Sequence, residues 1–329
     1  MQHIPQRRKI LAALAGVGLL GGLPLIARAG TFPQRPVKLI VPYPAGGVVD
    51  VAARIIADDV AQRWDQPIVV ENRAGANGNI GADLVKHAKP DGYTLLVGSM
   101  FVVINPLIDK ASRYATQDFD PIVGIGSPPN LLVVPASSPA TSLEEFVQLA
   151  RNYPGKFNTP NPGVGSSNHL GLELFMQESG VDLVQVNYKG QPPFLVDLIN
   201  GQLQFAYLTT ALALPHIQTG KLRALAVVSH QRLKALPEIP TLAEAGYSKA
   251  IVLPWNGLLA PAGTPEAVRD RSAAEVSQSL RKPGVIQRYE AMSAEIPEFT
   301  QNFSAFVQAE KTRWTKLVAE RKITTQGLL

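Results

Sequence analysis

The chain of 329 residues contains no cysteine, and this absence excludes disulfides, thiol catalysis and cysteine-ligated metals. A chain of this length buries a core large enough to need no such cross-link. Its five histidines include no pair at metal-ligand spacing, so we expect no zinc site and no cofactor. Beyond the first 30 residues, no segment offers the roughly 20 apolar residues of a membrane-spanning helix.

Basic charge is scarce once the amino-terminal segment is set aside. Arg7, Arg8 and Lys9 precede an apolar run over residues 10–23, and Ala27-Arg28-Ala29 follows. This pattern predicts an export signal over residues 1–29 and a periplasmic protein, with the Arg7-Arg8 pair favouring the twin-arginine route. A retained amino-terminal anchor is the alternative. Without these residues the formal net charge falls from +5 to +1, which removes the electrostatic argument for a nucleic-acid partner.

A glycine turn stands near the start of the mature chain. The apolar run over residues 37–41 predicts a buried strand, Pro42 and Pro44 end it, and Gly46-Gly47 permits backbone geometry that other residues avoid. Helical spacing of apolar residues begins directly after the glycines. Free amides and the helix dipole at such a start attract a carboxylate or phosphate, so the stretch predicts a small-anion site. A turn that needs glycine for its shape alone is the alternative.

Strands and helices then alternate. Residues 67–71 and 93–99 read as strands with a helical stretch between them, which predicts a parallel sheet. Ligands of such sheets lie at the carboxyl ends of the strands, so we expect residues 43–47 and 98–100 to lie together.

The second half of the chain repeats this logic. A second glycine-rich turn over residues 161–169 precedes a helical stretch, and strands are expected at 131–135, 184–188, 205–208 and 222–228. Capping boxes begin at Ser142 and Thr241. Breakers near residues 125–130 and 252–257 predict two crossings between lobes. We therefore expect residues 30–127 and 253–329 to form lobe 1 and residues 128–252 to form lobe 2.

Taken together, the motifs resemble the extracytoplasmic solute receptors of the tripartite tricarboxylate transporter family, often called Bug proteins. The resemblance covers nearly the whole mature chain and rests on motifs in the family's order: Val41-Pro-Tyr-Pro-Ala-Gly-Gly, Val70-Glu-Asn-Arg73, Gly78-Asn-Ile-Gly81, Pro90-Asp-Gly-Tyr-Thr-Leu96, Asn105-Pro106, Tyr188-Lys-Gly190 and Ala260-Pro-Ala-Gly-Thr-Pro265. It implies a two-lobed α/β periplasmic-binding-protein fold of the Venus flytrap type II class, with parallel-type sheets flanked by helices. It also implies a monomer, without catalysis, that delivers a small carboxylate to a membrane transporter.

Site residues carry over from the resemblance by position. In lobe 1 they are Tyr43, Ala45, Gly46, Val48, Val49, Asp50, Ser99 and Met100; in lobe 2 they are Gly163, Gly165, Ser166, Ser167, His169, Tyr188 and Thr209. Many relatives carry threonine at the position of Val49, so this site has lost a hydroxyl donor. We expect it to depend more on backbone donors and to accept a more apolar or aromatic carboxylate.

Several of these residues have a structural alternative. Asp50 can cap a helix, His169 can bond the turn behind it, and Tyr188 can belong to a surface loop. Ser166 and Ser167 beside His169 raise a hydrolase alternative, although His169 stands where a nucleophile elbow around Ser167 needs glycine. A ligand sensor that signals to a membrane protein is a further alternative with the same fold and site.

Overall fold

The computed structural model describes residues 32–188, 190–296, 300 and 302–325. The predicted export signal over residues 1–29 lies outside this range. None of the helices in the described residues combines the length and the apolar character that crossing a membrane requires. Residues 35–329 form one compact unit.

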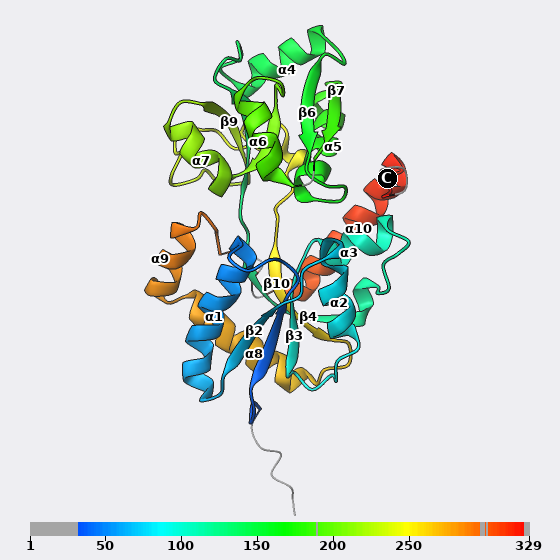
Figure 1. Cartoon of the computed structure of the whole chain (residues 1–329), viewed down its shortest axis with the longest axis vertical. Helices are drawn as coiled ribbons and strands as arrows, with labels where there is room; N and C mark the ends of the chain where they lie inside the picture. The colour runs from blue at the N-terminus through cyan, green and yellow to red at the C-terminus, as the bar shows by residue number, and fades with distance from the viewer. Residues whose placement is uncertain (1–31, 189, 297–299, 301, 326–329) are drawn as a thin grey trace, which may run out of the picture. The chain divides into compact units, whose positions relative to one another are not determined.

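A five-stranded sheet holds the amino-terminal glycine turn (Figure 1). Its strand order is β2 (Ile68–Asn72), β1 (Val37–Val41), β3 (Thr94–Ser99), β10 (Asn256–Pro261) and β4 (Phe119–Gly126). β1 runs parallel to β2 and β3, with Leu39 opposite Val70 and Leu95. β10 runs antiparallel to β3 and β4.

Helices cover both faces of this sheet. On one side α1 (Val48–Trp64), α8 (Glu266–Leu280) and α9 (Pro283–Ala291) pack together; on the other lie α2 (Asn79–Lys86), α3 (Phe101–Ile108) and α10 (Phe303–Arg321). Side chains of a strand alternate between faces, and Ile40 joins the core cluster of α3 and α10. Its neighbours Leu39 and Val41 are equally buried and therefore face the other layer. Trp314 and Leu317 of α10 belong to this core, so the last helix packs on the first sheet.

A second group of elements is built around β5 (Asn130–Pro135). β5 pairs antiparallel with β8 (Ala206–Thr209) and β9 (Leu222–Val228), while β6 (Phe157–Asn161) and β7 (Leu183–Asn187) form a separate parallel pair. The helices of this group are α4 (Leu143–Asn152), α5 (Ser167–Ser179), α6 (Gln191–Ile199) and α7 (Thr210–Gln218). Within the described residues, no strand of this group joins the five-stranded sheet.

Two chain segments, residues 127–129 and 251–255, connect the two groups of strands. Strands joined by a full helix run parallel, as the alternation predicted: β6 and β7 through α5, and β1 and β2 through α1. β5 and β10 each follow a connecting segment, and each runs antiparallel to its neighbours in its own sheet. The antiparallel strands β5 and β10 are therefore a feature that the sequence pattern did not predict.

One predicted helix start proved to be a turn. Thr241 and Glu244 exchange both hydrogen bonds of a capping box, Glu244 N to Thr241 Oγ1 at 3.0 Å and Thr241 N to Glu244 Oε2 at 2.7 Å. The chain nevertheless leaves the helical path at Gly246, whose φ is +88°. The box closes a single turn here because glycine ends it before a second one forms.

Candidate functional site

The first glycine turn joins β1 to α1 and is organised by the buried carboxylate of Asp50. Its Oδ2 atom accepts hydrogen bonds from the Gly46 amide at 2.9 Å and from Arg54 Nε at 3.0 Å. Its Oδ1 atom accepts a bond from Asn72 Nδ2 at 2.8 Å. Gly46 has a φ of +83°, which favours glycine because other residues are strained there. The side chain of Asp50 thus braces the turn from within.

Burial disfavours the charged form of Asp50, but the hydrogen bonds from Arg54, Gly46 and Asn72 outweigh it and hold the pKa of Asp50 below its usual value. The carboxylate therefore stays negative at neutral pH. Since like charges repel, we expect an anionic solute to meet the backbone amide of Asp50 and not its side chain.

The loop after β1 and the end of β3 lie together, as predicted. Tyr43 Oη and Ser99 Oγ share a hydrogen bond of 2.7 Å, and the Tyr43 ring packs edge-on against Phe101 at 6.2 Å between centroids. Burial raises the pKa of Tyr43, and the bond with Ser99 partly opposes this shift. Met100 is buried at the start of α3. The starts of α1 and α3 therefore belong to one loop cluster.

The other residues of this turn differ in solvent exposure. Ala45 and Gly46 are exposed on its rim, while Val48 and Val49 are half-buried in the first turn of α1. The amides of Val48, Val49 and Asp50 have no helical carbonyl four residues before them. The Gly46 amide, in contrast, is already occupied by Asp50.

The second glycine turn, between β6 and α5, satisfies its own glycine amides in the same way. Gly163 N donates to Asn161 Oδ1 at 3.0 Å, and Gly165 N donates to His169 Nδ1 at 3.3 Å. Ser166 caps α5 by accepting the His169 amide at 3.2 Å. A Cβ on Gly165 would lie 2.7 Å or less from side-chain atoms of Ile104 and Ile108 in α3. Gly165 therefore packs against α3, and glycine is required there by close approach as well as by its φ of +80°.

Tyr188 and Thr209 lie at the ends of β7 and β8, each held by a neighbouring helix. Tyr188 Oη donates to Asp197 Oδ2 at 2.6 Å, and its ring packs on Phe194. Burial, followed by the Asp197 carboxylate, raises the pKa of Tyr188 to about 12. Thr209 donates to Gln191 Oε1 through its amide at 3.0 Å and its hydroxyl at 3.1 Å.

Gln191 and Asn168 were missed by the sequence analysis. Gln191 Nε2 donates to Asn168 Oδ1 at 3.2 Å, and Asn168 Nδ2 donates to the Tyr207 carbonyl at 2.8 Å. With Thr209, these side chains join the starts of α5, α6 and α7. The available signal was positional, since Gln191 follows Gly190 and precedes Pro192 at a helix start.

Ser167 and His169 are directed to different partners. Ser167 Oγ lies 3.4 Å from both Asn130 Nδ2 and Asn168 Oδ1. His169 Nδ1 accepts the Gly165 amide, and its Nε2 faces Glu173. Neither nitrogen of the imidazole is directed at Ser167 as the base of a nucleophilic serine needs to be. In the part of the chain that the structure describes, no group of three or more His, Asp or Glu side chains is placed to hold a metal.

Residues 52–323 match the family model described as the tripartite tricarboxylate transporter family receptor. The chain belongs to this family. It is therefore a periplasmic solute-binding receptor of the group that includes the Bug proteins.

Curated relatives and solved structures agree with this assignment. The receptor is 35% identical over 320 residues to "UPF0065 protein in tcbD-tcbE intergenic region" of Pseudomonas sp. (strain P51), with 96% of this chain and 95% of the relative covered. It is 33% identical over 319 residues to protein BugT of Bordetella pertussis (strain Tohama I / ATCC BAA-589 / NCTC 13251), with 95% and 97% covered. A solved structure from R. palustris with adipate has a TM-score of 0.76 and 33% identity, with 89% and 99% covered. The fold is thus the two-lobed α/β fold of these binding proteins.

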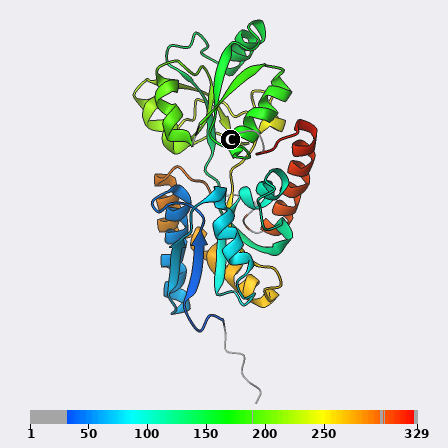
Figure 2. The ribbon, with the colours of Figure 1, turned by 45° about the vertical axis from the view of Figure 1, so that its right-hand side comes forward.

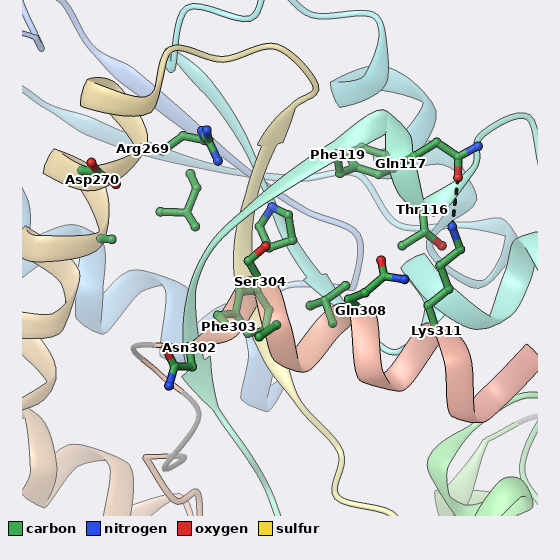
Figure 3. A pocket seen from close by; sticks show the side chains of 15 residues that line it. Thr116, Gln117, Phe119, Arg269, Asp270, Asn302, Phe303, Ser304, Gln308 and Lys311 are labelled. Carbon is green, nitrogen blue, oxygen red and sulfur yellow. Dashed lines mark hydrogen bonds between the residues drawn. The ribbon is translucent and has the colours of Figure 1, made fainter.

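Two cavities of the receptor lie away from the glycine turns. One of about 690 Å³ is bordered by β4, α8 and α10, and Figure 3 shows Arg269 and Lys311 among its polar lining, with Lys311 Nζ bonded to Gln117 Oε1 at 3.4 Å. Another of about 510 Å³ lies between α5 and α10 and is lined in part by Leu174 and Leu317. Neither cavity is lined by a residue that the sequence analysis assigned to the solute site.

Proposed function

We propose that the receptor captures a small carboxylated metabolite between its two lobes and delivers it to a tripartite tricarboxylate-type membrane transporter. In this proposal lobe 1 comprises residues 30–127 and 253–329, and lobe 2 comprises residues 128–252. The protein works as a monomer. One carboxylate of the solute binds at the starts of α1 and α3, and the turn from Gly163 to His169 together with Tyr188 reads the other end.

The observation that carries this proposal is the meeting of two helix starts in one loop cluster, bridged by Tyr43 and Ser99. Backbone amides at a helix start and the dipole behind them favour a carboxylate. A basic side chain is not needed for this binding mode. Arg54, the arginine of the first glycine turn, is engaged by Asp50 and by Asn72 Oδ1 at 3.0 Å.

We propose that Gly46 and Gly165 contribute to this site through the backbone conformation of the turns and not as hydrogen-bond donors to the solute. Because Asp50 and His169 already occupy the Gly46 and Gly165 amides, the α1 donors proposed for the carboxylate are the amides of Val48, Val49 and Asp50. The amide of Ser167 in α5 is proposed for the other end of the solute. At Gly46 a built Cβ meets no protein atom within 4 Å, so the space above the turn is open to a ligand.

Related structures support the chemical class of the solute. Besides the R. palustris structure with adipate, MatC from Rhodopseudomonas palustris was solved with bound malate; it has a TM-score of 0.72 and 32% identity, with 87% of this chain and 100% of that chain covered. We propose a carboxylate here too, with a more apolar body because Val49 supplies no hydroxyl. A ligand-sensing module for a signalling protein shares this site. The neighbouring genes distinguish the two: genes for membrane transporter subunits would favour uptake, and a gene for a sensor kinase would favour signalling.

A thermal-shift screen of carboxylic acids tests the proposal most broadly. The protein is unfolded and refolded first, so that no carried-over solute remains. An acid at 100 times its dissociation constant stabilises the folded form by about 2.7 kcal/mol, which raises Tm by roughly 4 °C for a protein of this size. Matched alcohols or amides without the carboxylate are the controls. A panel in which no acid raises Tm above its control contradicts the proposal, and ester hydrolysis lost in Ser167→Ala favours the hydrolase.

A further inference from the structure

Glu173 of α5 lies where three elements meet. Its Oε1 atom accepts a hydrogen bond from Gln185 Nε2 of β7 at 2.6 Å. Its Oε2 atom accepts two from the guanidinium of Arg321 in α10, Nε at 2.9 Å and Nη2 at 2.6 Å. The side chain of Glu173 is 13% exposed and that of Arg321 is 35% exposed, so the carboxylate is shielded from solvent while the guanidinium is partly exposed.

The same carboxylate faces the imidazole of His169. Glu173 Oε1 lies 3.9 Å from His169 Nε2, and on the other side of the ring Nδ1 accepts the Gly165 amide. A histidine nitrogen accepts a hydrogen bond only when it carries no proton, so Nδ1 must be bare and Nε2 carries the hydrogen that faces Glu173. Protonation of His169 at Nδ1 breaks the bond that shapes the turn.

Arg321 reaches Glu173 from a helix that is anchored elsewhere. Trp314 and Leu317 of α10 are buried in the core of the five-stranded sheet, and Arg313 Nη2 donates to the Ile251 carbonyl of the connecting segment at 2.8 Å. Figure 2 shows α10 as the long red helix. The last turn of this helix thus supplies a fixed positive charge to α5.

We propose that Glu173 orients the His169 ring with its hydrogen on Nε2, and that Arg321, by compensating the Glu173 charge, keeps Nδ1 unprotonated so that it accepts the Gly165 amide. Together they maintain the second glycine turn in its solute-binding shape. The inference rests on the proposed function, in which this turn reads the solute. Glu173 and Arg321 are positioning residues, since they act through His169. Of the described residues packed around His169, Glu173 is the charged one facing it, Arg321 stands behind Glu173, Gln185 of β7 is neutral, and α3 presents Ile104 and Ile108 to the turn.

The two halves of the ion pair are expected to act in opposite directions. Burial lowers the pKa of His169, and the Glu173 carboxylate opposes this shift. Glu173→Gln removes the opposing charge, so the pKa of His169 falls further. Arg321→Met leaves Glu173 uncompensated, so the pKa of His169 rises. If the Glu173–Arg321 pair only held α5 and α10 together, both variants would shift the pKa of His169 in the same direction, because both break the same contact.

An NMR titration of the histidine ring protons in the solute-free protein measures this directly. His169 is assigned by comparison with His169→Gln. We expect its pKa to fall in Glu173→Gln and to rise in Arg321→Met, with half a unit equal to about a threefold change in the ratio of protonated to neutral ring. Arg232→Met breaks the comparable but exposed pair with Glu244 and serves as the control that leaves His169 unchanged. Shifts in the same direction, or none, overturn the proposal.

Calorimetric titration with the acid identified by the screen then ties His169 to binding. The pH below which affinity declines is expected to move down in Glu173→Gln and up in Arg321→Met, following the two titrations. Affinity that declines at one common pH in all three proteins overturns the link to binding. A wild-type protein that binds no acid overturns the proposed function instead, and the NMR result still decides whether Glu173 and Arg321 control His169.

Discussion

Asp50 illustrates what the sequence can and cannot predict at the scale of a residue. Its place at a helix start indicated a helix cap as one alternative, and the structure shows instead a third-position side chain that accepts the Gly46 amide before the helix. The third partner, Asn72, comes from the end of β2 and is brought there by folding. Glu173, Gln191 and Asn168 were missed because partners such as Arg321, Thr209 and the Tyr207 carbonyl lie on other elements and are brought to them by folding.

Tyr188 provides a test of selectivity at this scale. In Tyr188→Ala, an acid with a second polar end should lose more affinity than a simple monocarboxylate of similar length, because only the former needs the second lobe. A selective site distinguishes ligands by a difference in binding free energies, and the loss of one buried contact changes this difference by roughly 1–2 kcal/mol.

Calorimetric titration of both acids into wild type, Tyr188→Ala and Tyr188→Phe measures this ratio. Tyr188→Phe removes the hydrogen bond to Asp197 but keeps the ring, and so separates the two contributions. An affinity ratio unchanged in Tyr188→Ala means that selectivity resides in lobe 1.

At the scale of elements, the glycine turns, their helices and most strands were predictable because breakers and apolar periodicity mark them locally. β4 was missed, since Asp120, Pro121 and two glycines interrupt its apolar pattern. Its place at the edge of the sheet explains why proline is tolerated there. β5 and β10 each enter a sheet directly after a connecting segment, and apolar periodicity does not indicate the direction in which such a strand runs.

A charged network ties α1 to α8 and α9. Asp59 Oδ1 accepts Lys282 Nζ at 2.7 Å, Asp59 Oδ2 accepts Ser279 Oγ at 2.6 Å, and Arg63, which also bonds Asp59, donates to Glu275 at 2.6 Å. Burial disfavours the charged form of Asp59, but the bonds from Lys282, Ser279 and Arg63 outweigh it and lower the pKa of Asp59 to about 2.

This pKa predicts a specific loss of stability in acid. A depressed carboxyl pKa contributes stability that is complete above the pKa of the unfolded chain, near 4, and is lost as the pH falls towards 2. After allowance for solvent screening we expect about 1–2 kcal/mol from Asp59. Urea unfolding of wild type and Asp59→Asn from pH 2.5 to 7 measures it. A stability difference that does not shrink in acid contradicts this role.

At the scale of the whole molecule, the motif order predicted the family and the two-lobed fold, because so many short matches in one order leave little room for another fold. The boundaries of the lobes and the identity of the solute stay predictions. The sequence indicates which groups of the protein can donate to a carboxylate far better than it indicates the shape of the cleft that the apolar part of the solute fills.

The binding mode also predicts a weak dependence on salt. A carboxylate held by neutral amides at helix starts is screened less than one paired with an exposed lysine or arginine. Raising the salt from about 0.05 M to 0.5 M should therefore weaken binding by no more than roughly threefold. Titrations across this range with sodium chloride measure the slope, and a tenfold or greater loss indicates a charged first contact.

Gly46 carries the central claim that the first glycine turn receives the carboxylate, and Gly263 offers a closely matched control. Their φ angles are +83° and +85°, a built Cβ meets nothing within 4 Å at either, and each amide donates to an aspartate Oδ2 at 2.9 Å. Gly263 follows β10, which runs antiparallel to β3. It therefore lies at the opposite end of the strands from the first glycine turn.

The most direct measurement is therefore a calorimetric titration of Gly46→Val and Gly263→Val with the acid found in the screen, after thermal melts have shown that both variants fold. Both substitutions introduce the same backbone strain, so similar decreases in Tm are expected. The account predicts that Gly46→Val loses binding by at least tenfold for every acid tested, whereas Gly263→Val binds like wild type. Equal affinity of the two variants would contradict it and place the carboxylate elsewhere.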